Sequence, residues 1–384
     1  MRVTTASTYR NFTGSVNDVH LKLNKSLNKV STGEAYERAA DNPLAHYTGK
    51  KIDSQYLDTL SKNTLLTDVK NRLYQQELGA RDIQDILSKA KNQVQYAKTA
   101  TTTGEHDIDT IKQDLLQKQQ TIVNDLNTQY QDFYVFGGND VSTTPFSLSA
   151  SEDQMVLTYS HIFPGETEVT EFKMTFKKQN DGSYGFSQPI EVSEGGNLLS
   201  VADGQNKLVK AMSEQGRIDI GYGAINDRGT LLDTYTGGLN ILTGLNSDAV
   251  KAMNSNTAYS NIMDAMNKSP IALIGKAVLG ISDYQNTGDK DVLDDVLGDT
   301  IDEMSMTEHT LSTSYSDLGN KYKLLEDTAK KLDTIEDSLT EQYKDILGAD
   351  PYASIMEMYN YQYSYNAALQ VGSKLLSSSL FDFL

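Results

Sequence analysis

Residues 66–97 read LTDVKNRLYQQELGARDIQDILSKAKNQVQYA, and this stretch decides the fold. Within it, apolar or small side chains and one glutamine recur at alternating spacings of three and four residues, the a/d pattern of a helix that packs against other helices. The ten positions are Leu66, Val69, Leu73, Gln76, Ala80, Ile83, Leu87, Ala90, Val94 and Ala97. The length of the pattern predicts a long bundle helix.

A helix with the same pattern is expected upstream, near the N-terminus. Its stripe consists of Phe12, Val16, Val19, Leu23, Ser26 and Val30. The run Ser31-Thr32-Gly33 ends it, because glycine readily takes the left-handed backbone of a helix C-cap. The second helix then begins near Pro43, with Asp41 or Asn42 as its N-cap and proline in its first turn.

Further helical stretches are expected to complete a bundle. After a break at residues 99–104, a third helix runs as far as Gly137 and Gly138, with the stripe Ile108, Ile111, Leu115, Gln119, Ile122, Leu126 and Phe133. Helical periodicity returns over residues 270–284 and, after a break at 286–288, in Leu297, Ile301, Met304, Leu311, Tyr315, Leu318, Tyr322, Leu325, Ala329, Leu332, Leu339 and Ile346. We expect residues 66–133 and 297–346 to form one antiparallel bundle.

The segment between these helices has a different pattern. Apolar runs at residues 155–159 and 169–176 predict strands, and Pro164-Gly165 and Asn180-Asp181-Gly182 predict the turns that bound them. The later part is punctuated by Gly195, Gly196, Gly221, Gly223, Gly237 and Gly238 and is expected to mix short strands, loops and short helices.

The last helix, after Gly348-Ala349-Asp350-Pro351, has an unusual surface. Its stripe is Ile355, Tyr359, Leu369, Leu376 and Leu380, widened by Tyr361, Tyr363 and Tyr365. Its charged residues are Glu357, Lys374 and Asp382, far fewer than a solvated helix carries. Apolar stripes more often belong to a core within one chain. For both terminal helices we nevertheless expect packing between chains.

The predicted fold class is mainly α, with paired N- and C-terminal helices and a long antiparallel helical bundle. Residues 1–45 and 348–384 should form a terminal helical assembly domain, and residues 46–138 and 270–347 the bundle domain. Residues 139–269 should form an inserted outer domain, β-rich or mixed.

Composition excludes several classes of protein. The net charge of -18 argues against a nucleic-acid partner, because phosphate binding needs a concentrated basic face. The absence of cysteine excludes disulfides, thiolate metal sites and a cysteine nucleophile. The first twenty residues contain no apolar core of a signal peptide, and no stretch is apolar enough to span a bilayer.

No motif for catalysis or for a metal or cofactor is found. His20, His46, His106, His161 and His309 are scattered, with no metal-ligand spacing. The aspartates between residues 289 and 299 lack the spacing of a calcium loop and suit the start of a helix instead. Gly221-Tyr222-Gly223 lacks the third glycine of a dinucleotide loop. We therefore expect neither an enzyme nor a cofactor.

Residues 30–45, VSTGEAYERAADNPLA, resemble the N-terminal motif of the flagellin superfamily. The matching positions are Ser31, Thr32, Gly33, Arg38, Asp41, Asn42 and Pro43, whereas Glu34 stands where a basic residue is usual. Residues 133–138, FYVFGG, followed by TTPF at 143–146, and the end LFDFL at 380–384 are similar to hook-filament junction proteins, the hook-associated protein three family.

This resemblance implies a structural subunit that joins the hook to the filament of a bacterial flagellum. It further implies export without a cleaved signal, an extracellular location and an export chaperone. The partners would be further copies in a ring, a neighbouring hook-associated protein, flagellin and the export apparatus. The expected assembly residues are Phe12, Val16, Val19, Leu23, Val30, Ile355, Tyr359, Leu369, Leu376, Leu380, Phe381, Phe383 and Leu384. Two alternatives remain open: a flagellin, or a coiled-coil adaptor or adhesin unrelated to flagella.

Overall fold

A computed structural model describes residues 5–100, 105–151, 153–214, 217–219, 231–233 and 237–381. The chain forms two compact units, residues 1–64 with 330–384 and residues 65–329. The boundary between the units falls inside two long helices, α2 (Pro43–Ala100) and α9 (Lys290–Leu347).

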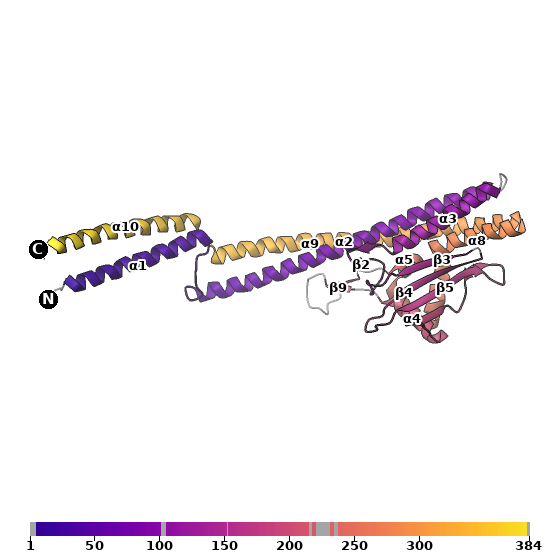
Figure 1. Cartoon of the computed structure of the whole chain (residues 1–384), viewed down its shortest axis with the longest axis horizontal. Coiled ribbons are helices and arrows are strands. Elements are labelled where there is room, and N and C mark those ends of the chain that lie inside the picture. Colours follow the sequence, from indigo (N-terminus) through magenta and orange to yellow (C-terminus); the bar gives the residue numbers. More distant parts are fainter. Residues whose placement is uncertain are drawn as a thin grey trace. The chain divides into compact units, whose positions relative to one another are not determined.

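In the larger unit, α2 and α9 run antiparallel to each other (Figure 1). The ring centroids of Tyr74 and Tyr322 lie 5.9 Å apart, and the guanidinium of Arg81 lies 5.5 Å from the centre of the Tyr315 ring. Further along, Lys91 forms an ion pair with Glu308. All ten stripe positions between residues 66 and 97 are buried, none with more than 2 % of its surface exposed. The predicted antiparallel bundle is confirmed.

Helices α3 (Glu105–Leu126) and α8 (Pro270–Thr287) complete the helical layer and contact each other. Ser269 caps the start of α8, since its hydroxyl accepts a hydrogen bond from the Ala272 amide, and Gly288, with φ of 71°, caps its end. Residues on every side of α8 are buried, because it contacts α3 and also strands of the sheet. The predicted helix is confirmed, but it extends to Thr287, so the break comes at Gly288, the last residue of the predicted break.

The third helix ends earlier than the sequence predicts. α3 stops at Leu126, and Phe133 lies in a short hairpin of β1 (Gln129–Tyr130) and β2 (Phe133–Tyr134). The reason is a distant partner: the side-chain Nδ2 of Asn127 donates to the Phe146 carbonyl at 2.7 Å, and its Oδ1 accepts from the Phe146 backbone amide at 2.9 Å. These two bonds hold residue 127 against the sheet, so the helix is not continued.

The inserted segment begins with the predicted strands. They are β3 (Phe146–Ala150), β4 (Gln154–His161), β5 (Thr170–Lys178), β6 (Tyr184–Phe186), β7 (Glu191–Glu194) and β8 (Asn197–Leu198). The sheet is antiparallel, in the order β3-β4-β5-β7-β8, and β6 pairs with β5. Alternate residues of β4 and β5 are buried, such as Leu157 and Met174. The predicted turn at 180–182 follows β5, with Gly182 at φ of 88°.

The rest of the insertion is mixed, as expected. It contains α4 (Val201–Ser213), β9 (Arg217–Asp219), β10 (Leu231–Asp233), α5 (Gly238–Thr243), α6 (Ser247–Lys251) and α7 (Ser255–Asn267). α4 contacts α7 and β7, and α7 contacts β6, so that these helices cover the sheet together with α8. Gly221, Tyr222 and Gly223 lie outside the described residues.

The smaller unit contains α1 (Thr5–Thr32), α10 (Pro351–Phe381) and the adjoining ends of α2 and α9. α1 and α10 lie side by side and antiparallel (Figure 1), which confirms the predicted pairing of the terminal helices. Among the described residues of this unit, the buried hydrophobic side chains are Ile52, Leu332 and Leu339. The unit therefore has almost no core of its own.

Candidate assembly interface

The pairing of α1 with α10 is shown by four contacts spread along both helices. A Cβ atom added to Gly372 would lie 2.6 Å from Cζ of Phe12. The rings of His20 and Tyr365 are 5.3 Å apart, and the Ser26 hydroxyl donates to the Ser354 carbonyl at 3.3 Å. Lys29 and Glu357 also form an ion pair, at 3.2 Å. The two helices therefore run in opposite directions along one seam.

On α1, this seam coincides with most of the predicted stripe. Phe12, Val16, Val19 and Leu23 are half-buried and Ser26 is buried, whereas Val30 is exposed. These four apolar residues, predicted to form an interface between copies, therefore face the partner helix of their own chain. Whether they also contact a second copy stays a prediction.

On α10, the seam differs from the predicted stripe. It consists of Ser354, Met358, Tyr361, Tyr365, Ala368 and Gly372, spaced four and three residues apart and buried or half-buried. The predicted residues Ile355, Tyr359 and Leu369 each come directly after a seam residue, so they point about 100° away from it and are exposed. The side chains of Leu376, Leu380 and Phe381, and the whole of Phe383 and Leu384, lie outside the described residues.

A second stripe lies on the outer face of α10; sequence reasoning named Tyr359 and Tyr363 but not Tyr352 and Met356. Tyr352, Met356, Tyr359 and Tyr363 are spaced four, three and four residues apart, and 84 %, 61 %, 58 % and 78 % of their surfaces are exposed. We call these four residues the outer stripe. The 4-3-4 spacing of large apolar residues is the signal that could have revealed it. The helix carries two charged residues, Glu357 and Lys374, and Glu357 already pairs with Lys29.

Exposed apolar side chains are concentrated in the smaller unit. In the part of the chain whose side chains are described, 23 large hydrophobic residues are exposed, and 15 of them lie in residues 1–64 or 330–384. That unit has less than half the residues of the larger one. A monomer that exposes so much apolar surface next to so small a core is expected to bury it against another chain.

The family-motif segment links the ends of the helices. Gly33 has φ of 73°, and its amide donates to the Lys29 carbonyl at 2.9 Å, which ends α1 as predicted. The Ala35 amide then donates to the Leu347 carbonyl at 2.7 Å, and the Ala349 amide to the Gly33 carbonyl at 2.8 Å. These bonds fasten the α1–α2 connection to the α9–α10 connection. The hydroxyls of Ser31 and Thr32 donate back to the carbonyl of residue 28.

The second half of the motif caps α2. The Asn42 side chain accepts a hydrogen bond from the Ala45 amide at 3.1 Å, and Pro43 is the first helical residue, as predicted. Asp41 accepts from the Arg38 amide at 3.2 Å and from the Lys25 ammonium at 2.9 Å. The hydrogen bond from Lys25 is the main reason that the pKa of Asp41 is lowered. The motif thus has a structural role at the junction of four helix ends.

Among the described residues, no group of three or more histidine, cysteine, aspartate or glutamate side chains could hold a metal ion. His161 is buried beside Tyr159 and Phe163, and burial lowers its pKa. Asp289 accepts from the Val292 amide at 3.3 Å directly before α9, which places it at the start of a helix, as the sequence predicts.

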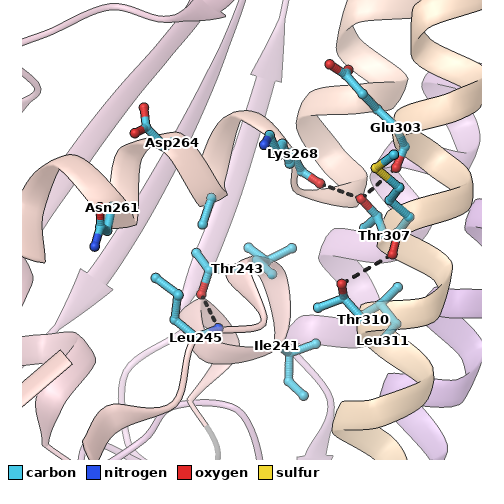
Figure 2. A pocket seen from close by; sticks show the side chains of 13 residues that line it. Ile241, Thr243, Leu245, Asn261, Asp264, Lys268, Glu303, Thr307, Thr310 and Leu311 are labelled. Carbon is cyan, nitrogen blue, oxygen red and sulfur yellow. Dashed lines mark hydrogen bonds between the residues drawn. The ribbon is translucent and has the colours of Figure 1, made fainter. Parts of the chain in front are cut away.

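A pocket of about 530 Å³ lies between α5, α7 and α9 (Figure 2). Its polar groups largely bond to the chain itself: the Thr243 hydroxyl accepts from the Leu245 amide, and the Thr307 hydroxyl donates to the Lys268 carbonyl. No histidine or cysteine is among its described lining residues. The exposed helical surface of the smaller unit is therefore the better candidate for function.

In the described part of the chain, every helix is too short or too polar to cross a membrane.

No protein-family model and no curated protein matches the chain. Among solved structures, it is similar to a protein from Vibrio parahaemolyticus described as a flagellar hook-associated protein, with 12 % identity, a TM-score of 0.49, and coverage of 80 % of this chain and 100 % of that one. It is similar to FlgL of Bacillus cereus, with 15 % identity, a TM-score of 0.40 and coverage of 77 % and 99 %. It is also similar to flagellar hook-associated protein 3 of Legionella pneumophila, with 11 % identity, a TM-score of 0.39 and coverage of 77 % and 98 %.

Proposed function

We propose that this chain is a structural subunit of a bacterial flagellum that forms the junction between hook and filament. The observation that carries the proposal is the uncharged, exposed outer stripe of α10, in a unit with three buried hydrophobic residues in its described part. Such a surface suits a protein that completes its core by assembly. The reason for assigning the chain to a flagellum is the resemblance of three segments, residues 30–45, 133–146 and 380–384, to flagellar proteins.

In the proposed mechanism, the two faces of α10 have separate tasks. The seam through Ser354 and Gly372 binds α1 of the same chain, and the outer stripe is left for neighbouring copies. The backbone hydrogen bonds between residues 33–35 and residues 347–349 fix the point at which the pair of α1 and α10 begins. The burial of apolar surface between copies then offsets the conformational entropy that the chains lose when they assemble.

The proposal includes partners and a location. Further copies form a ring, which contacts a neighbouring hook-associated protein on one side and flagellin on the other. The chain reaches the outside of the cell through the flagellar export apparatus, with a chaperone and without signal cleavage. No reaction and no cofactor belongs to this role, and the chain is proposed not to be an enzyme.

The test is immunogold electron microscopy of cells whose chain carries an epitope in the turn at Asp181 and Gly182. This turn is exposed, and a Cβ atom added to Gly182 would have no neighbour within 4 Å, so an insertion there is expected to be tolerated. Gold confined to the boundary between hook and filament is the expected result.

The other outcomes point to the alternatives. Gold along the whole filament would make the chain a flagellin. Absence of gold from flagella, in cells that contain the labelled protein, would contradict the flagellar role and favour a coiled-coil adaptor or adhesin.

A further inference from the structure

His161 is a buried histidine at the last position of β4. Only 2 % of its surface is exposed. Its ring stacks on that of Tyr159, with centroids 5.8 Å apart, and the ring of Phe163 lies nearly perpendicular to it at 4.8 Å. Pairing with Thr170 of β5 holds the residue in the sheet. A ring that can take up a proton therefore lies inside an aromatic cluster.

The site provides a hydrogen-bond partner for only one nitrogen of the ring. Nδ1 of His161 lies 3.2 Å from the Tyr159 hydroxyl. Because burial raises the pKa of Tyr159, this hydroxyl keeps its proton and donates it to Nδ1. Nε2 then carries the ring hydrogen, and it is buried without a hydrogen-bond partner among the described residues. A second proton, on Nδ1, would break the bond from Tyr159 and leave that O–H without its acceptor.

Two cations of α4 lie against the same cluster. The ammonium groups of Lys207 and Lys210 are 5.1 and 4.7 Å from the centre of the Phe163 ring. Lys207 also forms ion pairs with Glu166 at 2.8 Å and with Glu194 of β7 at 2.6 Å. These contacts hold α4 on the sheet, and they place positive charge on a ring that His161 touches.

These surroundings keep His161 neutral. Burial lowers its pKa, and the charge of Lys210 acts in the same direction, whereas Asp140, Glu166 and the Gly137 carbonyl oppose them. In an unfolded chain a histidine titrates near pH 6.5. Below that pH an open site binds a proton that the closed site rejects. The stability that the neutral ring gives the closed site is therefore complete above about pH 6.5 and is lost as the pH falls.

We propose that His161 is an acid-sensitive switch, whose protonation releases α4 and residues 162–169 from the sheet while the bundle of α2 and α9 stays folded. When α4 separates, the ring becomes accessible and binds a proton, and the ammonium groups of Lys207 and Lys210 then oppose closing. Opening exposes Leu208 and Met212, which are buried under α4. The switch belongs to one folded chain, so it does not require the proposed function.

The neighbouring carboxylates keep their charge between pH 7.5 and pH 5.5. The hydrogen bond from Lys207 lowers the pKa of Glu166. Burial acts to raise the pKa of Asp140, but the hydrogen bonds that it accepts outweigh burial and lower the pKa. Burial raises the pKa of Asp125 to about 6, so its protonation stabilises the fold, in the opposite sense to that of His161. Substitution of His161 alone therefore isolates the switch.

Hydrogen exchange followed by mass spectrometry of the full chain at pH 7.5 and pH 5.5 tests the switch. After correction for the intrinsic effect of pH, protection of residues 201–213 should be about tenfold lower at pH 5.5, because the open state titrates near pH 6.5. Protection of residues 66–97 should not fall. His161→Gln and His161→Phe cannot titrate, so both should abolish the loss of protection in α4. His309→Gln, at an exposed position of α9, is the matched control and should keep it.

Equal protection of α4 at the two pH values in the natural chain, or an undiminished loss in either His161 variant, would overturn the proposal. A second reading needs no variant: the NMR signal of the imidazole Hε1, assigned from its contacts with Tyr159 and Phe163. In the closed chain this signal should keep the shift of a neutral ring down to pH 5.5. Titration of the signal near pH 6.5 with α4 still protected would also overturn the switch, since the closed site would then accept the proton.

Discussion

Among single residues, Asp125 on α3 has an unfavourable charge in the folded bundle. One of its carboxylate oxygens is buried without a hydrogen-bond partner. Burial, and secondly the charge of Asp82 on α2, raise its pKa from 3.8 to about 6. The folded state therefore binds this proton more tightly than the unfolded chain, so stability falls as the pH rises from about 4 to about 6 and stays lower above that.

Asp125→Asn should consequently stabilise the unit formed by residues 65–329 at neutral pH. We expect the free energy of unfolding to rise by about 1 kcal/mol at pH 7.5 and to change very little at pH 4. The figure at pH 7.5 is kept small because solvent screens a half-buried group. Thermal unfolding at the two pH values measures this difference. Asp109→Asn, at an exposed position of the same helix, serves as the control. An equal gain at both pH values would show that charge is not the cause.

Between helices, a glycine decides how closely α1 and α10 approach. Any Cβ at residue 372 would press into the Phe12 ring, so Gly372→Val should force the two helices apart. Because the smaller unit has so little core, we expect this change to reduce the helicity of the terminal helices and to leave the larger unit folded.

Hydrogen exchange followed by mass spectrometry can resolve the two units. Faster exchange in residues 5–32 and 351–381, with unchanged protection in residues 66–97, is the expected pattern. Ser373→Val is the matched control, since Ser373 is exposed on the neighbouring position and its change should have no such effect. Unchanged exchange in Gly372→Val would contradict the close approach.

Individual elements also show how far the sequence was informative. The stripe at residues 66–97 could be predicted because its positions follow one period throughout, and the strands at 155–159 and 169–176 because their short apolar runs are bounded by turn residues. The end of α3 could not, since the side chain of Asn127 bonds to Phe146, nineteen residues away. Of the α10 seam, the sequence analysis named Tyr361 and Tyr365 but not Ser354, Ala368 and Gly372, because these three allow close packing by their small size and hydropathy does not register size.

At the level of the whole molecule, the proposed function requires that folding of the monomer and assembly depend on different surfaces. The seam, the fastened connections and the bundle serve the monomer, whereas the outer stripe has no partner within the described chain. A change confined to the outer stripe should therefore separate the two properties. Replacing residues of the seam would disturb both at once.

The variant Tyr359→Glu with Tyr363→Glu makes this separation. Two charges on an exposed face should leave the circular dichroism of the monomer within error of the natural chain, but burying them between copies would be costly, so the variant should be lost from isolated flagella. Gln113→Glu with Gln117→Glu adds the same charges to exposed positions of α3 and should incorporate normally. If the tyrosine variant builds normal junctions, the outer stripe is not the contact between copies. If it incorporates poorly and also loses helicity, the stripe belongs to the monomer, and the division of α10 into two faces is wrong.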